Sequence, residues 1–239
     1  ATERCHLPVD MQLYLPKCWT DDAERRKEAR IPPEVGFLTK PQMALAMAQR
    51  ARAAGIAPGT VLCDSAFGDS GDFRHGIREL ELHYAAGIHL TTLVCPEDSP
   101  ERPLSAQKLL EGLSVRKFRR YLWREGERGE MSARFAFVRV RIPKDPRQEL
   151  LWLVFEWRDG EATAQRAHLT SLPLHTGKHR LIYLLKERWR TEMVYRELKQ
   201  ELGLAHYEGR RWRGWNHHVS VVLCCYAFVA AVRESSEPP

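Results

Sequence analysis

The stretch LIYLLKERWRTEMVYRELKQELG, residues Leu181–Gly203, decides how the rest of the chain is interpreted. It is built from strong helix formers, has no proline, and meets its first glycine at its last residue. A glycine directly after a helical pattern is a common stop signal. The sequence therefore predicts one long helix that ends at Gly203.

Two charged rows run along this predicted helix at about 100° per residue. The first row predicts an ordinary solvated face and consists of Glu187, Arg190, Glu197 and Glu201. The second row runs through the apolar half and consists of Arg188, Glu192, Arg196 and Lys199. Charges within an apolar half are costly unless they are paired, bound to metal or placed around an anion. The row is therefore either a ladder of ion pairs that docks the helix or a metal-binding carboxylate flanked by cations for phosphate.

The composition is that of a folded, basic protein. A length of 239 residues suits one large domain or a domain with an insertion, and a hydrophobic content of 44% excludes a disordered chain. Lys and Arg number 37 against 31 Asp and Glu, which gives a net charge of +6. This balance favours a polyanionic partner such as nucleic acid without requiring one.

The cysteines and the apolar runs predict a cytoplasmic protein. The six cysteines show no CxxC pair or zinc spacing and lie mostly in apolar runs, which predicts reduced, buried thiols. No signal-peptide pattern is present. The most apolar run, Val219–Val232, is too short to span a bilayer and predicts a buried helix, so no membrane partner is expected.

The order of predicted elements indicates an α/β fold. The first part alternates strands and helices: strand Met11–Leu15, helices Trp19–Arg30 and Pro41–Ala54, strand Thr60–Cys63, loop Ser65–Gly71, helix Asp72–Ala86 and strand Ile88–Cys95. This alternation predicts parallel strands. Residues 96–175 form a β-rich insertion, with strands predicted at Arg134–Ile142, Leu150–Trp157 and Ala167–Leu172. The last part, 176–239, carries the long helix and a terminal apolar helix.

Two carboxylates are candidates for chemistry. Asp64 follows a short apolar strand, the position at which open α/β sheets place their sites, although an Asx-turn is the common use of such a residue. Glu192 lies on the predicted inward face of the long helix. Such a pair suits Mg²⁺, which takes a few carboxylate oxygens together with water and substrate phosphate. Asp69 and Asp72 are better interpreted as helix caps.

Two segments combine basic and aromatic side chains. HYEGRRWRGWNHH, residues His206–His218, suits contact with a nucleic-acid backbone and base stacking. Its alternative interpretation is a surface connector whose Trp212 and Trp215 anchor the last helix. For VRKFRRYLWR, residues Val115–Arg124, a solvated strand face is the simpler interpretation.

The sequence RWRTE, then six residues, then Lys199, followed by QELGLAHYEGRRWRGWNHH, resembles the catalytic signature of DDE insertion-sequence transposases, specifically the IS701 group within the IS4-like families. That signature is Tyr-x₂-Arg-x₃-Glu-x₆-Lys. Arg188, Glu192 and Lys199 match it, whereas Leu185 stands where the tyrosine is expected. The segments LPVDMQLYLPKCWTDD, RRKEARIPPEVGFLTKPQMAL and VLCDSAFGDSGDFRHGIREL are also similar to the family, and Asp64 matches its second catalytic aspartate.

The resemblance implies an RNase H-like catalytic core, with a β-rich insertion before the helix that carries Glu192. It divides the chain into a partial core (1–95), the insertion (96–175) and C-terminal core helices (176–239). It further implies cut-and-paste DNA transposition, with Mg²⁺ or Mn²⁺ held by Asp64, Glu192 and a third carboxylate, and a homodimer on DNA in a bacterial, nucleoid-associated setting. DNA contacts are expected from the basic side chains of Arg188, Arg196, Lys199, Arg210, Arg211 and Arg213.

One departure predicts a truncated transposase. In this family the first catalytic aspartate lies on a strand upstream of the LPVDMQLYLP segment, with which this sequence begins, and Asp10 lies within that segment. The expectation is that this chain does not transpose DNA by itself. A non-catalytic DNA-binding remnant is the main alternative, and an RNase H-like nuclease or resolvase that uses Asp69 is a further one.

Overall fold

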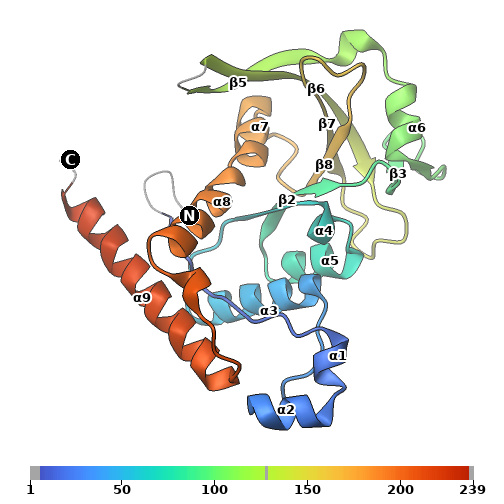
Figure 1. Ribbon diagram of the computed structural model, residues 1–239. Helices are drawn as coiled ribbons and strands as arrows, with labels where there is room; N and C mark the ends of the chain where they lie inside the picture. Colours follow the sequence, from blue (N-terminus) through green and yellow to red (C-terminus); the bar gives the residue numbers. More distant parts are fainter. Residues whose placement is uncertain (1–5, 127–128, 237–239) are drawn as a thin grey trace. The chain divides into compact units, whose positions relative to one another are not determined.

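The computed structural model describes residues 6–126 and 129–236 and divides the chain into two compact units. Unit 1 comprises Ala1–Ala54 and Trp189–Pro239, and unit 2 comprises Gly55–Arg188. Figure 1 shows unit 1 as mainly helical and unit 2 as a sheet with helices. The elements of unit 1 are α1 (Lys17–Thr20), α2 (Ala23–Ala29), α3 (Lys40–Ala53), α8 (Trp189–Gln200), the 3₁₀ turn η2 (Leu204–His206) and α9 (Trp212–Ser236).

Unit 2 is organised around one mixed sheet. Its strands are β1 (Thr60–Cys63), β2 (His83–Ile88), β3 (Leu93–Pro96), β4 (Leu104–Ser105), β5 (Arg119–Gly126), β6 (Gly129–Arg141), β7 (Leu151–Trp157) and β8 (Arg166–Thr170). Its helices are α4 (Ser65–Gly68), α5 (Gly71–Glu79), α6 (Ala106–Glu111), η1 (Val115–Lys117) and α7 (Lys178–Lys186). The strand order is β1-β2-β8-β7-β6-β3-β4, with β5 paired to β6.

The predicted α/β fold class is confirmed, with a correction to strand direction. Within the described residues, the β1–β2 pair is parallel, and Cys63 lies opposite Ala86. The pairs β2–β8, β8–β7, β7–β6, β6–β3, β3–β4 and β5–β6 are antiparallel. The 96–175 segment contributes central strands of this sheet, and the predicted boundary after Cys95 falls inside β3. The three-part division of the chain stays a prediction.

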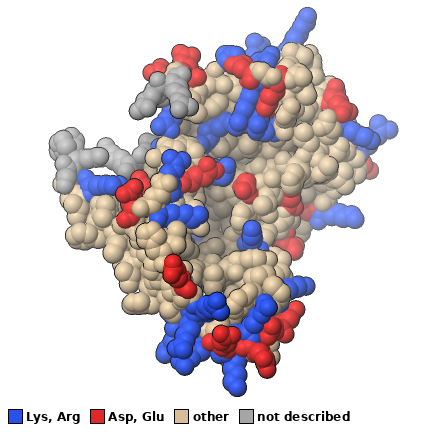
Figure 2. All heavy atoms as spheres, in the orientation of Figure 1, with Lys and Arg blue, Asp and Glu red and all other residues tan. Residues whose placement is uncertain are grey.

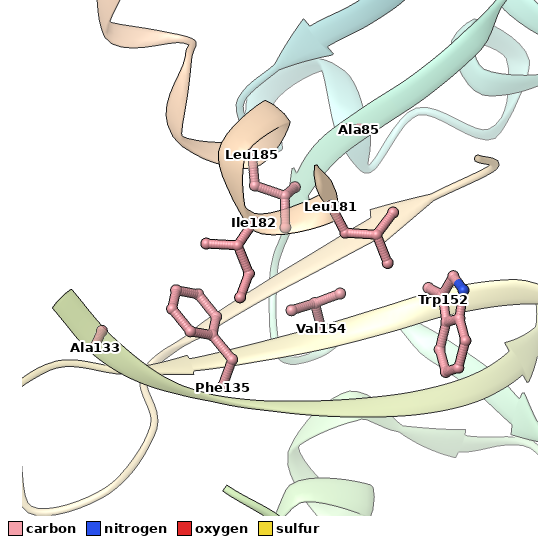
Figure 3. Close-up of a cluster of buried hydrophobic side chains, with 8 residues drawn as sticks. All are labelled: Ala85, Ala133, Phe135, Trp152, Val154, Leu181, Ile182 and Leu185. Carbon is pink, nitrogen blue, oxygen red and sulfur yellow. The ribbon is translucent and has the colours of Figure 1, made fainter. Parts of the chain in front are cut away.

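The core of unit 2 lies between α7 and the sheet. Leu181, Ile182 and Leu185 are buried and face Phe135 of β6 and Val154 of β7 (Figure 3). Burying a side chain of this size contributes about 1.5–3 kcal/mol. Leu185, which stands where the family signature has a tyrosine, is thus a packing residue in this chain.

The single long helix predicted over 181–203 is wrong. α7 ends at Lys186 and α8 begins at Trp189, with a turn at Glu187 and Arg188. The two halves serve different cores, because α7 packs on the sheet of unit 2 whereas Leu198 of α8 packs against α9 in unit 1. No proline or glycine marks the break, so tertiary packing imposes it.

The assignment of the helix faces is also corrected. Arg190, predicted to be solvated, is half-buried and contacts the His6 ring, and Glu197 lies 3.8 Å from Arg233 of α9. The second row, by contrast, is exposed at Glu192, Arg196 and Lys199, and so is Arg188 before α8. The first row is therefore the one that lies nearer the interior, and the second row lies at the surface.

The predicted helix Asp72–Ala86 and strand Ile88–Cys95 are wrong at their boundaries. α5 ends at Glu79 because Glu81 adopts a left-handed backbone with φ of 59°. The chain then enters β2, which is paired on both edges. Pairing on both sides overrides the helical character of HYAAGI, and a turn after Ile88 separates β2 from β3.

Of the elements predicted in the N-terminal part, the helix Pro41–Ala54 is confirmed as α3, whereas the strand and the helix predicted before it are wrong. No strand forms at Met11–Leu15, where Asp10 and Gln12 bind the Arg50 side chain of α3 at 2.8 and 3.1 Å. The predicted helix Trp19–Arg30 is divided into α1 and α2. Asp22 caps α2 by accepting a hydrogen bond from the Arg25 N–H.

The terminal helix is longer and more exposed than predicted. The stretch Trp212–Ser235 is long and apolar enough to cross a membrane by length and composition alone, and 17% of its apolar window is buried. The expectation of a short, buried helix is therefore wrong, and the absence of a membrane partner stays a prediction. The described cysteines are free, as predicted, but Cys18, Cys224 and Cys225 are exposed.

Thr39 begins α3 with a reciprocal cap. Its Oγ1 accepts from the Gln42 N–H at 3.4 Å, and the Thr39 N–H donates to Gln42 Oε1 at 2.9 Å. We expect Thr39→Ala to lower the free energy of unfolding by about 1 kcal/mol, because the cap is lost. Urea denaturation checks this, and Thr39→Ser, which keeps the hydroxyl, is the matched control. Equal losses in both variants would contradict the role of the cap.

Candidate functional site

Asp64 lies at the carboxyl end of β1, where the chain turns into α4. Its Oδ1 accepts a hydrogen bond from the Ala66 N–H at 3.1 Å, so the side chain caps α4. The alternative of a local turn role is therefore confirmed for this oxygen. Asp64 is nevertheless exposed, so the carboxylate still faces solvent at the predicted position.

A close contact between α4 and β2 fixes this turn. A Cβ added at Gly68 would lie 1.9 Å from the Gly87 carbonyl oxygen and 2.9 Å from the Ala86 Cβ. A Cβ at Gly87 would lie 3.2 Å from the Ser65 nitrogen and 3.5 Å from the Asp64 Cα. Two glycines thus let the turn that carries Asp64 lie directly on the neighbouring parallel strand.

Positive charge lies close to the end of β1. Burial and, to a lesser extent, the Asp64 charge raise the pKa of the Cys63 thiol to about 12, while the charges of Arg74 and Arg188 act in the opposite direction. Both guanidinium groups are therefore near enough to act on the residue next to Asp64. Of the predicted DNA-contacting residues, Arg188 is the one whose charge acts on Cys63, the residue next to Asp64.

Arg74 is a residue of this site that the sequence analysis does not identify. Its side chain is buried on α5 and donates to the Gly68 carbonyl oxygen, which braces the end of α4. Its Nε is buried without a hydrogen-bond partner in the described part of the chain. The signal was present, because helical spacing places Arg74 beside Phe73 and Ile77, the other buried residues of α5.

Glu192 lies in the first turn of α8, in unit 1, whereas Asp64 belongs to unit 2. On the same helix, Lys199 places its ammonium 4.2 Å from the centre of the Tyr195 ring. Glu192, Arg196 and Lys199 are all exposed, so this row of charges faces solvent. The row is therefore not enclosed in an apolar interior, which was predicted for it.

The described residues include one suitable ligand for a divalent cation but no complete binding site. Asp64 offers an exposed carboxylate at a strand end, which suits a hard cation that keeps several waters. Within residues 6–126 and 129–236, however, no group of three His, Cys, Asp or Glu side chains has the geometry of a metal site. Unit 2 by itself thus supplies one fitting ligand.

The carboxylates of Asp69 and Asp10 bind other groups in this structure, and Asp10 accepts a hydrogen bond from Arg50. The Asp69 carboxylate accepts from the His89 N–H at 3.0 Å and from the Thr92 hydroxyl at 2.9 Å, and it contacts the His89 ring. It therefore ties down the turn between β2 and β3. The predicted capping role of Asp69 and Asp72 is corrected, because Ser70 caps α5 by accepting from the Phe73 N–H.

The basic and aromatic segment after α8 lines two hollows in unit 1. Both hollows include Arg210 and Arg211, and the second also includes Arg213. Trp212 packs beside the buried residues Leu15 and Ile31, so the anchoring interpretation is confirmed for this tryptophan. The segment therefore combines a packing role with an exposed basic surface.

The segment Val115–Arg124 forms η1 and most of β5. Tyr121 and Trp123 pack on the core of unit 2, whereas Arg119, Arg120 and Leu122 are exposed. This alternation is that of a solvated strand face, as the simpler interpretation predicted.

Comparison with known proteins places the chain in a family. The sequence model of the DDE superfamily endonucleases matches residues 1–130, which is more than half of the 239 residues. The chain belongs to this family. No curated protein matches the chain. The matched region contains the β1–α4 turn with Asp64, and it ends before Glu192.

Membership in the family agrees with the chemistry of this turn. DDE endonucleases act on DNA and generally use divalent metal ions. The mixed sheet with its helices is consistent with an RNase H-like nuclease fold. Asp64 is thus a carboxylate of the required type at a strand end inside the matched region.

Proposed function

We propose that this chain is the catalytic-domain part of a DDE transposase of the IS701 group within the IS4-like families, and that it serves cut-and-paste transposition of DNA. The observation that carries the proposal is the exposed Asp64 carboxylate at the end of β1, inside the family match, with Arg188 near the adjacent residue. The match of Arg188, Glu192 and Lys199 to the signature spacing supports it further.

The residues take distinct roles in this proposal. Asp64 and Glu192 would hold Mg²⁺, or Mn²⁺ in its place, which when bound supplies activation of the attacking oxygen and stabilisation of the leaving one. Arg188 and Lys199 hold phosphates next to the cut, because guanidinium and ammonium groups bind phosphate oxygens. Arg196, Arg210, Arg211 and Arg213 extend this contact along the backbone. The protein acts as a homodimer on DNA in the bacterial cytoplasm.

We further propose that this chain alone does not cut DNA. Two carboxylates hold a catalytic metal poorly, and the Asp69 carboxylate, close in sequence to Asp64, is bound to His89 and Thr92. β1 is an end strand of the sheet within the described residues. A further strand with a carboxylate could pair on this edge and complete the site.

The binding part of this proposal predicts a salt-dependent affinity for duplex DNA. The logarithm of the binding constant is expected to fall linearly with the logarithm of the salt concentration. Arg188→Gln and Lys199→Gln are each expected to reduce the slope by about 1, as the loss of one phosphate contact does. Fluorescence anisotropy titrations at several salt concentrations measure this.

Arg139→Gln is the matched control, because Arg139 pairs with Glu97 at 3.5 Å on the sheet of unit 2. Its slope should equal that of the wild type. An affinity that does not change with salt would overturn the DNA-binding proposal. Nicking of supercoiled DNA with Mg²⁺ or Mn²⁺ that disappears in Glu192→Gln would overturn the proposed inactivity of the chain.

The main alternative is a DNA-binding remnant without chemistry. The lack of a three-ligand cluster among the described residues favours it. Calorimetric titration with Mn²⁺ separates the two, because weak binding that is lost in both Asp64→Asn and Glu192→Gln supports a catalytic fragment. An independent nuclease or resolvase is disfavoured, because it would need the Asp69 carboxylate, which ties down the turn after β2.

A further inference from the structure

Unit 1 contains an aromatic-walled cavity of about 480 Å³. It lies between the segment that leads into α1 and α2 and the segment that leads into α9. Its aromatic wall consists of Tyr14, Trp19, Tyr207, Trp212 and Trp215. A pocket of this volume is large enough for a small organic ligand, and rings on several sides suit a flat one.

A second hollow of about 410 Å³ continues from the first, because the two share Tyr207, Gly209, Arg210 and Arg211. The arginines that line the two hollows are Arg25, Arg30, Arg210, Arg211 and Arg213, against the single acidic residue Glu28. Arg25 pairs with Asp22 at 3.1 Å. The other four form no ion pair with any residue that the structure describes.

Figure 2 shows Lys and Arg side chains gathered over α2 and the start of α9, with a few acidic ones among them. The N-terminal end of α9, which carries the positive end of the helix dipole, adds to this field. An occupant of these hollows should therefore be flat and aromatic at one end and anionic at the other.

The wall of the cavity is held in place before any ligand binds. The Tyr207 hydroxyl donates to the Arg211 carbonyl oxygen at 2.9 Å. A Cβ added at Gly209 or Gly214 would lie 2.4 or 2.5 Å from that hydroxyl oxygen, so the two glycines make room for the ring. Trp212 is fixed by the neighbouring core, whereas Trp215 is half-buried and is not among the side chains grouped with that core.

We propose that this cavity binds one unpaired base of DNA, stacked on the aromatic wall that includes Trp215, while Arg30, Arg210 and Arg213 hold the adjoining phosphates. The inference rests on the proposed function as a DNA-binding protein and assigns an additional subsite to it. Aromatic stacking binds any base, and guanidinium groups bind phosphate oxygens. A proline-rich peptide also docks on aromatic walls, but it has no anionic group for four arginines.

Binding of three forms of one short duplex tests the inference. The first form carries a single unpaired adenosine, the second an abasic residue at that place, and the third is fully paired. The wild type is expected to bind the first about tenfold more tightly than the second, which corresponds to the stacking of one base. Equal affinity for these two forms would overturn the inference.

Two variants separate stacking from phosphate contact. Trp215→Ala is expected to abolish the preference for the adenosine form while the affinity for the paired duplex stays unchanged. Arg213→Gln is expected to weaken binding of all three forms equally and to reduce the salt slope by about 1. The matched controls are Phe228→Ala and Arg233→Gln, exposed residues of α9 that do not line either hollow.

Photo-crosslinking of the wild type keeps the test independent of folding defects. With 5-iodouracil as the unpaired base, crosslinks are expected in peptides that contain Trp19, Tyr207 or Trp215. Crosslinks confined to β5, the other basic and aromatic segment, would overturn the inference. Failure of the paired duplex to bind would instead reject the proposed function, so the two failures are distinguishable. Displacement of the adenosine form by a proline-rich peptide, with no effect of free dAMP, would assign the cavity to a peptide and overturn the inference.

Discussion

Replacing Glu156 by glutamine is expected to lower the free energy of unfolding by about 3–5 kcal/mol, the cost of breaking a buried ion pair. The Glu156 side chain on β7 is fully buried and contacts three cationic or potentially cationic groups. Lys186 of α7 pairs with Oε1, Arg158 donates to Oε1 at 2.7 Å, and the His168 ring lies 3.2 Å from Oε2. Glutamine would leave the Lys186 ammonium, on a side chain that is 12% exposed, without the Glu156 counter-charge.

The pH dependence of this contribution follows from the direction of the shift. Burial acts to raise the pKa of Glu156, but the hydrogen bonds from His168 and Arg158 and the charge of Lys186 outweigh it, so the pKa lies well below the usual value. A carboxyl with a depressed pKa in the folded state stabilises fully above its unfolded pKa of about 4.3. The difference between wild type and Glu156→Gln should therefore be full at neutral pH and shrink as the pH falls below about 4.

Urea denaturation at neutral and acidic pH measures both effects. Glu97→Gln is the matched control, because Glu97 pairs with Arg139 at 3.5 Å on the surface and should cost less than about 1 kcal/mol. A double-mutant cycle with Lys186→Met gives the coupling between the two charges. Strictly additive losses would show that Glu156 and Lys186 do not stabilise each other.

The sequence contained a signal for this network that its pattern alone could not resolve. Glu156 is the one charged residue in the apolar run LLWLVFEW, which predicted a strand correctly. A lone carboxylate in such a run is either at an exposed strand end or buried with partners. Arg158 is a local partner, but His168 and Lys186 lie on β8 and α7, at sequence separations that no local pattern covers.

Asp64 and Glu192 also show which features a local sequence pattern predicts and which it does not. Asp64 was predicted at the right place because a strand end and a helix cap are local features. The helix around Glu192 was predicted as unbroken because local propensity is continuous across Glu187 and Arg188. Only the assignment of Leu185 to the sheet core and of Leu198 to the core with α9 divides it. A single sequence therefore predicts local turns, whereas the continuity of a helix depends on the tertiary contacts of its residues.

Replacing Gly68 by alanine is expected to destabilise the protein by about 3 kcal/mol and to displace the turn that carries Asp64. The new Cβ would lie 1.9 Å from the Gly87 carbonyl oxygen, a backbone atom that no side-chain rotation can move. α4 would have to lift from β2, which also weakens the contact of Arg74 with the Gly68 carbonyl oxygen. Thermal or urea unfolding measures the loss of stability.

A local readout distinguishes a displaced turn from a general loss of stability. Cys63 precedes Asp64, is half-buried, and has its pKa raised to about 12 by burial, so it should react slowly with thiol reagents in the wild type. Gly68→Ala should speed its modification under conditions in which the protein remains folded, as peptide mapping can show. Gly59→Ala is the matched control in unit 2, because nothing lies within 4 Å of its added Cβ. If Cys63 stays as protected in Gly68→Ala as in Gly59→Ala, the contact between the two glycines does not hold Asp64 in place.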